Sequence, residues 1–197
     1  KDKIKKKFYF IDNLQPRLNI HKNKKIINII ISKSGNTLET ISNTKLLVNN
    51  NKKNIFITAN QKSHLRNLAN KMKSEIIDHN NFIGGRYSVL SEVGILPAEL
   101  MGLNSKKFKQ LNFLIKNKQF INQLIQNVES TLYLVQKNKY NSIILNYDER
   151  SDDLFKWYQQ LIAESLGKKS RGILPVISSM PKDNHSLMQF YLEGPKK

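Results

Sequence analysis

The sequence predicts an α/β fold with parallel sheets, and two observations lead to this prediction. Short β-branched runs alternate with helical patterns over residues 25–78, and the alternation restarts over residues 141–192. Such alternation is typical of layered α/β domains, in which helices cover a parallel sheet. The first run, Ile26–Ile31 (IINIII), is almost continuously apolar, as expected for a strand buried on both faces.

The first α/β unit is predicted to contain three strands and two helices before a glycine pair. In chain order they cover Lys25–Ser32, Leu38–Asn49, Asn54–Ala59, Gln61–Met72 and Ser74–Asp78. Gly84 and Gly85 then interrupt the pattern. The segment Tyr87–Met101 is predicted to be helical despite Pro97.

A helical connection is predicted to precede a second α/β unit. Its two helices lie near Ser105–Asn117 and Phe120–Lys137. The second unit then has strand, helix, strand and helix patterns at Asn141–Asn146, Asp152–Leu166, Ile173–Ser178 and Asn184–Leu192. Ser151 or Asp152 is the expected N-cap of the helix Asp152–Leu166. We expect the first unit over residues 1–102, the connection over 103–138 and the second unit over 139–197, with both sheets incomplete in this chain.

Composition narrows the classes of function. The 197 residues include 33 lysines and arginines against 15 acidic residues, a net charge of +18, which could indicate nucleic-acid binding. The lysines are scattered without interleaved aromatic residues, and Lys, Asn and Ile are abundant throughout, so a compositional bias is the better explanation. The chain has no cysteine, no apolar run long enough to span a bilayer and no secretory signal pattern. We therefore expect a cytoplasmic protein that binds neither nucleic acid nor membrane.

The segment Ser32–Thr37 (SKSGNT) follows a predicted buried strand and precedes a predicted helix. A helix N-terminus offers unpaired backbone N–H groups and the positive end of the helix dipole, which together suit a phosphate dianion. Ser32, Ser34 and Thr37 add hydroxyl donors, and Gly35 lets the backbone approach a ligand closely. An ordinary capped turn would show the same residues, so both interpretations remain open.

Arg86 follows the glycine pair in Asn81–Ser88 (NFIGGRYS). Glycines allow the chain to pass tightly beside a ligand, and a fixed guanidinium can stabilise negative charge that develops on a substrate oxygen. The alternative is a glycine turn with a solvent-facing arginine.

Two further candidates lie in the second unit. Gln160 and Glu164 are four residues apart and share one face of a predicted helix, where a carboxylate can act as a general base. His185 lies where the last helix is expected to begin, and a histidine can exchange a proton near neutral pH. A solvated glutamate and an ordinary surface histidine are the alternatives.

Taken together and in this order, these segments resemble the phosphoglucose isomerase family. Ile31–Thr40 (ISKSGNTLET) is similar to its phosphate-binding loop, and Ile83–Ala98 (IGGRYSVLSEVGILPA) is similar to its signature segment, which is the most specific match. Gln160–Lys168 and Asp183–Gly194 (DNHSLMQFYLEG) resemble its base-bearing and histidine-bearing segments. The resemblance runs from about Phe8 to the last residue.

The resemblance implies an aldose–ketose isomerase that interconverts glucose 6-phosphate and fructose 6-phosphate through a cis-enediolate, in glycolysis and gluconeogenesis. It implies two sugar-isomerase domains, each a three-layer α/β/α unit, in a homodimer, with no metal or organic cofactor. The resemblance also implies a role for each candidate residue. Ser32, Ser34 and Thr37 would hold the phosphate, with Lys33 beside them, and Arg86 would stabilise the enediolate. Gln160 would contact sugar hydroxyls, Glu164 would transfer the proton, and His185, from the neighbouring subunit, would assist ring opening.

The chain also departs from the family pattern. The family's glycine–serine loop and its C-terminal lysine are absent, so we expect a central piece of the enzyme that is inactive alone. Glu92 replaces a residue that is usually small, which we interpret as a packing variation. A mannose-phosphate or bifunctional isomerase and a non-catalytic sugar-phosphate-binding module are the alternatives. The segments around Arg86 and His185 favour the glucose enzyme, and a binding module would not need Glu164 together with both.

Overall fold

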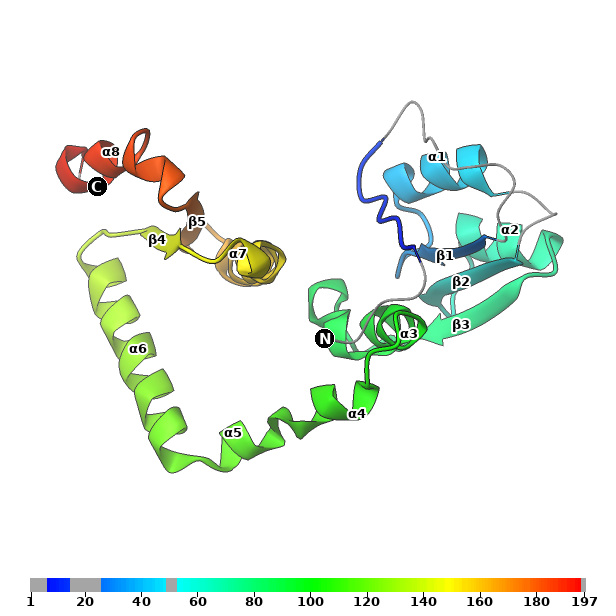
Figure 1. The fold of residues 1–197 in the computed structure, drawn as a ribbon, viewed down its shortest axis with the longest axis horizontal. Helices are drawn as coiled ribbons and strands as arrows, with labels where there is room; N and C mark the ends of the chain where they lie inside the picture. Colours follow the sequence, from blue (N-terminus) through cyan, green and yellow to red (C-terminus); the bar gives the residue numbers. More distant parts are fainter. Residues whose placement is uncertain (1–6, 15–25, 49–52, 196–197) are drawn as a thin grey trace. The chain divides into compact units, whose positions relative to one another are not determined.

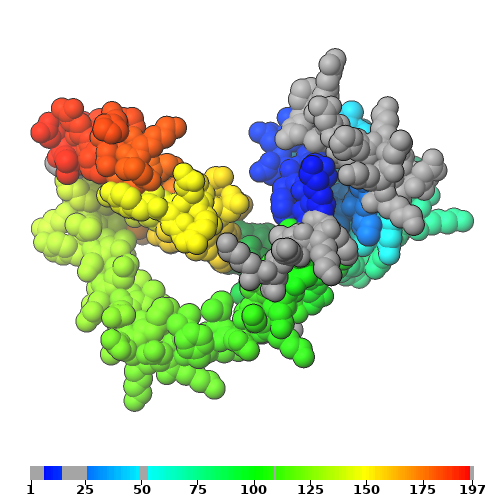
Figure 2. Space-filling view, in the orientation of Figure 1, coloured from blue at the N-terminus to red at the C-terminus, as the bar shows by residue number. Residues whose placement is uncertain are grey.

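The computed structural model describes residues 7–14, 26–48 and 53–195 of the chain. Two compact units are present, residues 1–109 and residues 110–197, and each is described by itself. Figure 1 shows their helices and strands, and Figure 2 shows the atoms of both units in the same orientation. Among the described residues, no helix is both long enough and apolar enough to cross a bilayer.

The first unit is built on a parallel three-stranded sheet (Figure 1). The strands β1 (Ile27–Ile31), β2 (Lys53–Ala59) and β3 (Glu75–His79) lie in the order β1-β2-β3. The helices α1 (Leu38–Leu47) and α2 (His64–Lys71) connect them. The predicted α/β fold with parallel sheets is therefore confirmed. The predicted ends of the first strand and first helix, Lys25 and Asn49, lie outside the described residues.

The core of this unit lies between the sheet and its two connecting helices. Phe56 on β2 is fully buried and packs with Ile30 of β1 and with Leu65 and Ala69 of α2. Ile57, the next residue on β2, is also fully buried, so β2 is covered on both faces. Burial of such side chains stabilises the fold by roughly 1.5–3 kcal/mol each. This packing fixes the sheet whose edge carries the residues discussed below.

Two helical predictions in the first unit need correction. The helix predicted from Gln61 begins only at His64, because the Ser63 hydroxyl accepts a hydrogen bond from the Arg66 amide and so caps α2. The single helix predicted over Tyr87–Met101 is a 3₁₀ helix, η1 (Gly85–Leu90), followed by α3 (Glu92–Leu100).

The break between η1 and α3 lies at Ser91. Its backbone is extended, and its hydroxyl donates to the Ser88 carbonyl at 2.7 Å while accepting from the Val93 amide at 3.4 Å. Gly94 makes the tight turn possible, because a Cβ there would lie 2.0 Å from the Val89 carbonyl oxygen. Local side-chain hydrogen bonds therefore replace continuous helix at this point.

The helix predicted over Ser105–Asn117 is also divided. It forms α4 (Ser105–Phe108), the 3₁₀ helix η2 (Lys109–Leu111) and α5 (Asn112–Lys116). None of its described side chains is fully buried, so tertiary packing does not reinforce a longer helix. Asn117 then caps α6 (Lys118–Gln136) by accepting from the Phe120 amide at 3.1 Å.

The second unit contains a parallel pair of strands, β4 (Asn141–Asn146) and β5 (Leu174–Ser179), connected by α7 (Asp152–Leu166). The bounds of β4 and α7 match the prediction. Ser151 occupies the N-cap position of α7 but does not cap it through its side chain. Its hydroxyl donates instead to the Asp148 carbonyl and to the side chain of Asn146.

The final predicted helix, Asn184–Leu192, is replaced by a 3₁₀ helix, η4 (Lys182–Asn184), and a short helix, α8 (Met188–Glu193). His185 follows η4 and therefore does not begin a helix as predicted. The cause is the preceding carboxylate, Asp183, which hydrogen-bonds the residues around it and is described below.

Candidate functional site

The segment Ser32–Thr37, called here the hydroxyl loop, connects β1 to α1. Ser32 is buried, and its hydroxyl lies 2.8 Å from the Thr37 hydroxyl and accepts from the Gly35 amide at 3.2 Å. The Thr37 hydroxyl also lies 3.5 Å from that of Ser34. The three hydroxyls predicted to hold a phosphate therefore form one cluster at the start of α1.

The helix N-terminus beside this cluster keeps amide donors that suit an anion. Thr37 occupies the N-cap of α1, yet its side chain accepts no capping hydrogen bond there. The Ile41 amide donates to the Thr37 carbonyl, so the amides of the first turn precede the intrahelical ladder. A phosphate at this position would be bound by backbone N–H groups and by the positive end of the helix dipole.

The start of α2 fixes the shape of the hydroxyl loop. Gly35 has a φ of +66°, and a Cβ at this position would lie 2.2 Å from the Ser63 hydroxyl oxygen. The Gly35 carbonyl accepts from the Leu65 amide at 3.0 Å, and the Asn36 side chain accepts from the His64 amide at 2.9 Å. Glycine is therefore required both by its backbone conformation and by its close approach to α2.

Arg86 lies in the segment Asn80–Ser88, called here the arginine turn, which follows β3. Its guanidinium carbon lies 4.8 Å from the centre of the Tyr87 ring, an arrangement typical of a cation–π contact. The Ser88 hydroxyl is buried and donates to the Gly85 carbonyl at 2.6 Å. The backbone that precedes and follows Arg86 is thereby held in one tight turn.

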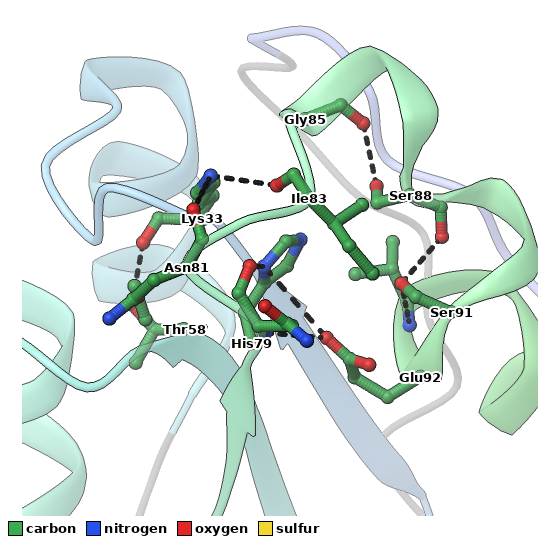
Figure 3. Close-up of polar contacts among 12 residues, drawn as sticks. Lys33, Thr58, His79, Asn81, Ile83, Gly85, Ser88, Ser91 and Glu92 are labelled. Carbon is green, nitrogen blue, oxygen red and sulfur yellow. Dashed lines mark hydrogen bonds and ion pairs between the residues drawn. The ribbon is translucent and has the colours of Figure 1, made fainter.

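Glu92 has a role that the sequence analysis missed. Its carboxylate accepts from the Asn80 amide at 3.2 Å and lies 3.8 Å from the buried ring of His79 (Figure 3). Glu92 therefore anchors the first residue of the arginine turn to α3, and the interpretation as a packing variation is incomplete. The two residues are twelve positions apart, so no local pattern indicates this contact.

Lys33 joins the hydroxyl loop to the arginine turn. Its ammonium donates to the Asn81 carbonyl at 2.9 Å and to the Ile83 carbonyl at 2.7 Å (Figure 3). The two segments were predicted as separate motifs. The structure brings them together at the carboxyl edge of the sheet, the usual place for ligands in α/β folds.

In the second unit, Gln160 and Glu164 lie on one face of α7, as predicted. The Gln160 amide donates to the Glu164 carboxylate at 2.9 Å, and this contact lies at the exposed surface of the helix. The neighbouring Gln159 donates to the Pro175 carbonyl at 2.8 Å and so attaches α7 to β5. This second contact orients the helix that carries the candidate base.

His185 is exposed, and Asp183 holds the turn that carries it. The Asp183 carboxylate accepts from the Ser178 hydroxyl and the Ser179 amide, both at 2.7 Å, and from the Ser186 hydroxyl at 3.1 Å. The hydrogen bond from Ser178, followed by that from the Ser179 amide, lowers the pKa of Asp183 below its ordinary value. Sequence reasoning missed Asp183, although an acidic residue among serines and close to a histidine is a recognisable turn signal.

The predicted site residues therefore fall into one set in each unit. The first unit carries Ser32, Lys33, Ser34, Thr37 and Arg86, and the second carries Gln160, Glu164 and His185. Within the described ranges, no three His, Cys, Asp or Glu side chains gather closely enough to bind a metal ion.

Comparison with known proteins supplies the family. The family model described as phosphoglucose isomerase matches residues 9–174, which include the hydroxyl loop, the arginine turn and α7. The chain belongs to the phosphoglucose isomerase family. The resemblance inferred from the four segments is thereby confirmed.

Similar proteins in other organisms agree with this family. Glucose-6-phosphate isomerase of Methanocaldococcus jannaschii is 36% identical over 206 residues, which cover 95% of this chain and 51% of the relative. The enzyme of the same name in Mycoplasmopsis pulmonis is 33% identical, with 88% of this chain and 44% of the relative covered. The chain thus spans about half the length of these phosphoglucose isomerase relatives.

The fold is also similar to that of a solved structure. The crystal structure of a hypothetical protein from Thermus thermophilus matches with a TM-score of 0.68 and 26% sequence identity. The match covers 85% of this chain and 44% of that protein. The family assignment and the observed α/β architecture are therefore consistent with each other.

The close approach of Gly35 to Ser63 generates a prediction for stability. Gly35→Ala should destabilise the protein both through its positive φ, by about 1–2 kcal/mol, and through the clash with Ser63, by a further ~1–3 kcal/mol. Gly102→Ala is the matched control, because Gly102 has a φ of +84° but a Cβ added there would meet no atom within 4 Å. Urea unfolding of the two variants should separate the clash from the backbone cost. Equal losses of stability would show that the loop does not pack against α2 as described.

The lowered pKa of Asp183 predicts a pH dependence of stability. The carboxylate stabilises the folded state above its ordinary pKa of 3.8, and this contribution disappears as the pH falls through the lower folded-state pKa. Asp183→Asn should therefore lower the thermal unfolding midpoint at neutral pH, and the difference from wild type should vanish in acid. Glu193→Gln, which removes an exposed carboxylate on α8, should change the midpoint little at any pH. A difference between Asp183→Asn and wild type that is constant with pH would contradict this role.

Proposed function

We propose that the full-length protein interconverts glucose 6-phosphate and fructose 6-phosphate through a cis-enediolate, in glycolysis and gluconeogenesis. The observation that carries this proposal is the connection of the hydroxyl loop to the arginine turn within one unit. Family membership and the relatives named glucose-6-phosphate isomerase support it. A phosphate-binding loop beside a fixed guanidinium is the arrangement that a sugar-phosphate isomerase needs.

The phosphate group anchors the substrate in this proposal. Ser32, Ser34 and Thr37 supply hydroxyls from one cluster, and the first turn of α1 supplies amides. The phosphate does not react, so its binding energy can position the carbons that do react. Net positive charge on the protein attracts such a dianion.

The chemical step is a proton transfer between neighbouring carbons. The Glu164 carboxylate removes the proton from C2 of the open-chain aldose, and the C2–H electron pair forms the enediolate while the carbonyl oxygen at C1 becomes negatively charged. The hydroxyl proton at O2 then passes to O1, which moves the negative charge to O2. The same carboxyl group returns its proton to C1 while the C2–O2 carbonyl forms, which gives the ketose. Arg86 stabilises the negative charge between these steps.

Gln160 and His185 support this chemistry. The hydrogen bond from the Gln160 amide to the Glu164 carboxylate supports an orienting role for Gln160, which would also contact sugar hydroxyls. His185, on the turn held by Asp183, exchanges a proton with the ring oxygen during ring opening. In a homodimer it would act in the neighbouring subunit's site.

The domain assignment belongs to the same proposal. Residues 1–102 would be the later part of one sugar-isomerase domain, residues 103–138 the helical connection, and residues 139–197 the first part of a second such domain. The protein would work in the cytoplasm on a sugar phosphate, without nucleic-acid or membrane partners and without a cofactor.

Replacement of the proposed base tests the function directly. Glu164→Gln keeps the size of the side chain and removes its basicity, so turnover should fall by roughly 100- to 10,000-fold while binding of fructose 6-phosphate persists. The measurement is kcat for glucose 6-phosphate and for mannose 6-phosphate in a dehydrogenase-coupled assay, together with calorimetric binding. Glu129→Gln is the matched control, because Glu129 is exposed on α6.

Turnover of Glu164→Gln within about tenfold of wild type would remove Glu164 from this role. A Glu164→Gln variant that binds the sugar phosphate much more weakly, but keeps its kcat, would also remove Glu164 from this role. Preference of the wild-type protein for mannose 6-phosphate would replace the glucose assignment, and absence of all turnover would favour a binding module.

A further inference from the structure

The Lys33 side chain leaves the loop in which its backbone lies. The hydroxyls on either side of it cluster with Thr37, but its ammonium reaches across to carbonyls 48 and 50 residues later in the chain. A lysine ammonium has three N–H donors, and two of them are directed at the Asn81 and Ile83 carbonyls (Figure 3). Lys33 therefore spans two segments rather than belonging to one.

The backbone of Lys33 is fixed as firmly as its ammonium. Its carbonyl accepts from the Ala59 amide at 3.0 Å and from the Thr58 hydroxyl at 3.3 Å. Both donors lie at the end of β2, the central and most buried strand of the unit. The Lys33 side chain thus extends from a backbone that is fixed to β2. Its ammonium can therefore define the position of the two carbonyls that it binds.

The other described hydrogen bonds of this part of the arginine turn, residues 80–83, are made through its first residue, Asn80. Glu92 accepts from the Asn80 amide, the Asn80 side chain accepts from the Phe82 amide at 2.9 Å, and the Asn80 carbonyl accepts from the Ile83 amide at 3.2 Å. Phe82, at the centre of this stretch, is 99% exposed and so adds no packing. Hydrogen bonds from a charged donor are roughly twice as strong as neutral ones, and the Lys33 contacts are the ones that attach residues 81–83 to the hydroxyl loop.

We propose that Lys33 is a positioning residue that locks the arginine turn to the hydroxyl loop and thereby sets where Arg86 lies relative to the substrate phosphate. This inference rests on the proposed isomerase function and refines it. Lys33 was expected to contact the substrate beside the hydroxyls. In the proposed role it acts through Arg86, because the carbonyls that it binds lie three and five residues before the guanidinium-bearing residue.

A double-mutant cycle in the full-length protein tests this role. Lys33→Met removes the charge and the donors while it keeps the length of the aliphatic chain, and it should lower kcat by about 10- to 100-fold with a smaller change in KM. In an Arg86→Lys background the same substitution should lower kcat by less than about threefold, because the group that it positions is already altered. Lys33→Arg should recover part of kcat, and Lys45→Met, on α1, should leave activity unchanged.

The opposite pattern would overturn the proposal. If Lys33 contacts the phosphate directly, Lys33→Met should raise KM and weaken the binding of inorganic phosphate. These effects should then be equal in the wild-type and Arg86→Lys backgrounds. Hydrogen–deuterium exchange of the Asn80–Gly85 amides supplies a readout that does not depend on activity. Lys33→Met should speed this exchange and Lys45→Met should not. If the wild-type protein shows no isomerase activity, the proposed function fails, and unchanged exchange in Lys33→Met independently rejects the positioning role.

Discussion

The parallel order of β1, β2 and β3 is the constraint on which the candidate site of the first unit depends. Parallel strands present their carboxyl ends at one edge, so the segments that follow them meet there even when they are far apart in the chain. Ser32 follows β1 and Asn80 follows β3, and the buried β2 separates them by a single strand. The arginine turn can contact the hydroxyl loop because both lie at this edge of the sheet. The core around Phe56 holds the sheet in place.

Charged side chains then fix the turns at this edge and in the second unit. Lys33 donates to carbonyls of the arginine turn, and Glu92 accepts from an amide of the same turn. Asp183 performs the equivalent task around His185 by accepting from Ser178, Ser179 and Ser186. In each case a charged side chain satisfies backbone or hydroxyl groups of a nearby turn. Such contacts explain how short turns can hold the candidate side chains, Arg86 and His185, in defined positions.

The sequence was sufficient to predict elements with strong local patterns, and insufficient where distant residues decide. The bounds of β4 and α7 were predicted correctly because β-branched and helical patterns act within each segment. The helix expected over Tyr87–Met101 is broken because Ser91 bonds Ser88 and Gly94 packs under Val89, which propensity does not reveal. The hydroxyl loop and Arg86 were recognised as motifs, but the contacts of Lys33 depend on the completed sheet. The role of Asp183 was missed although its turn signal is local, because such a signal does not specify which donors the carboxylate accepts from.

The location of the substrate phosphate tests the central claim of this account most directly. A crystal structure of the full-length protein with fructose 6-phosphate should show the phosphate within hydrogen-bond distance of the Ser34 and Thr37 hydroxyls, at the first turn of α1. Arg86 should then lie on the side of the carbonyl and hydroxyl oxygens at C1 and C2. A phosphate bound away from the hydroxyl loop, with the loop empty, would contradict the account.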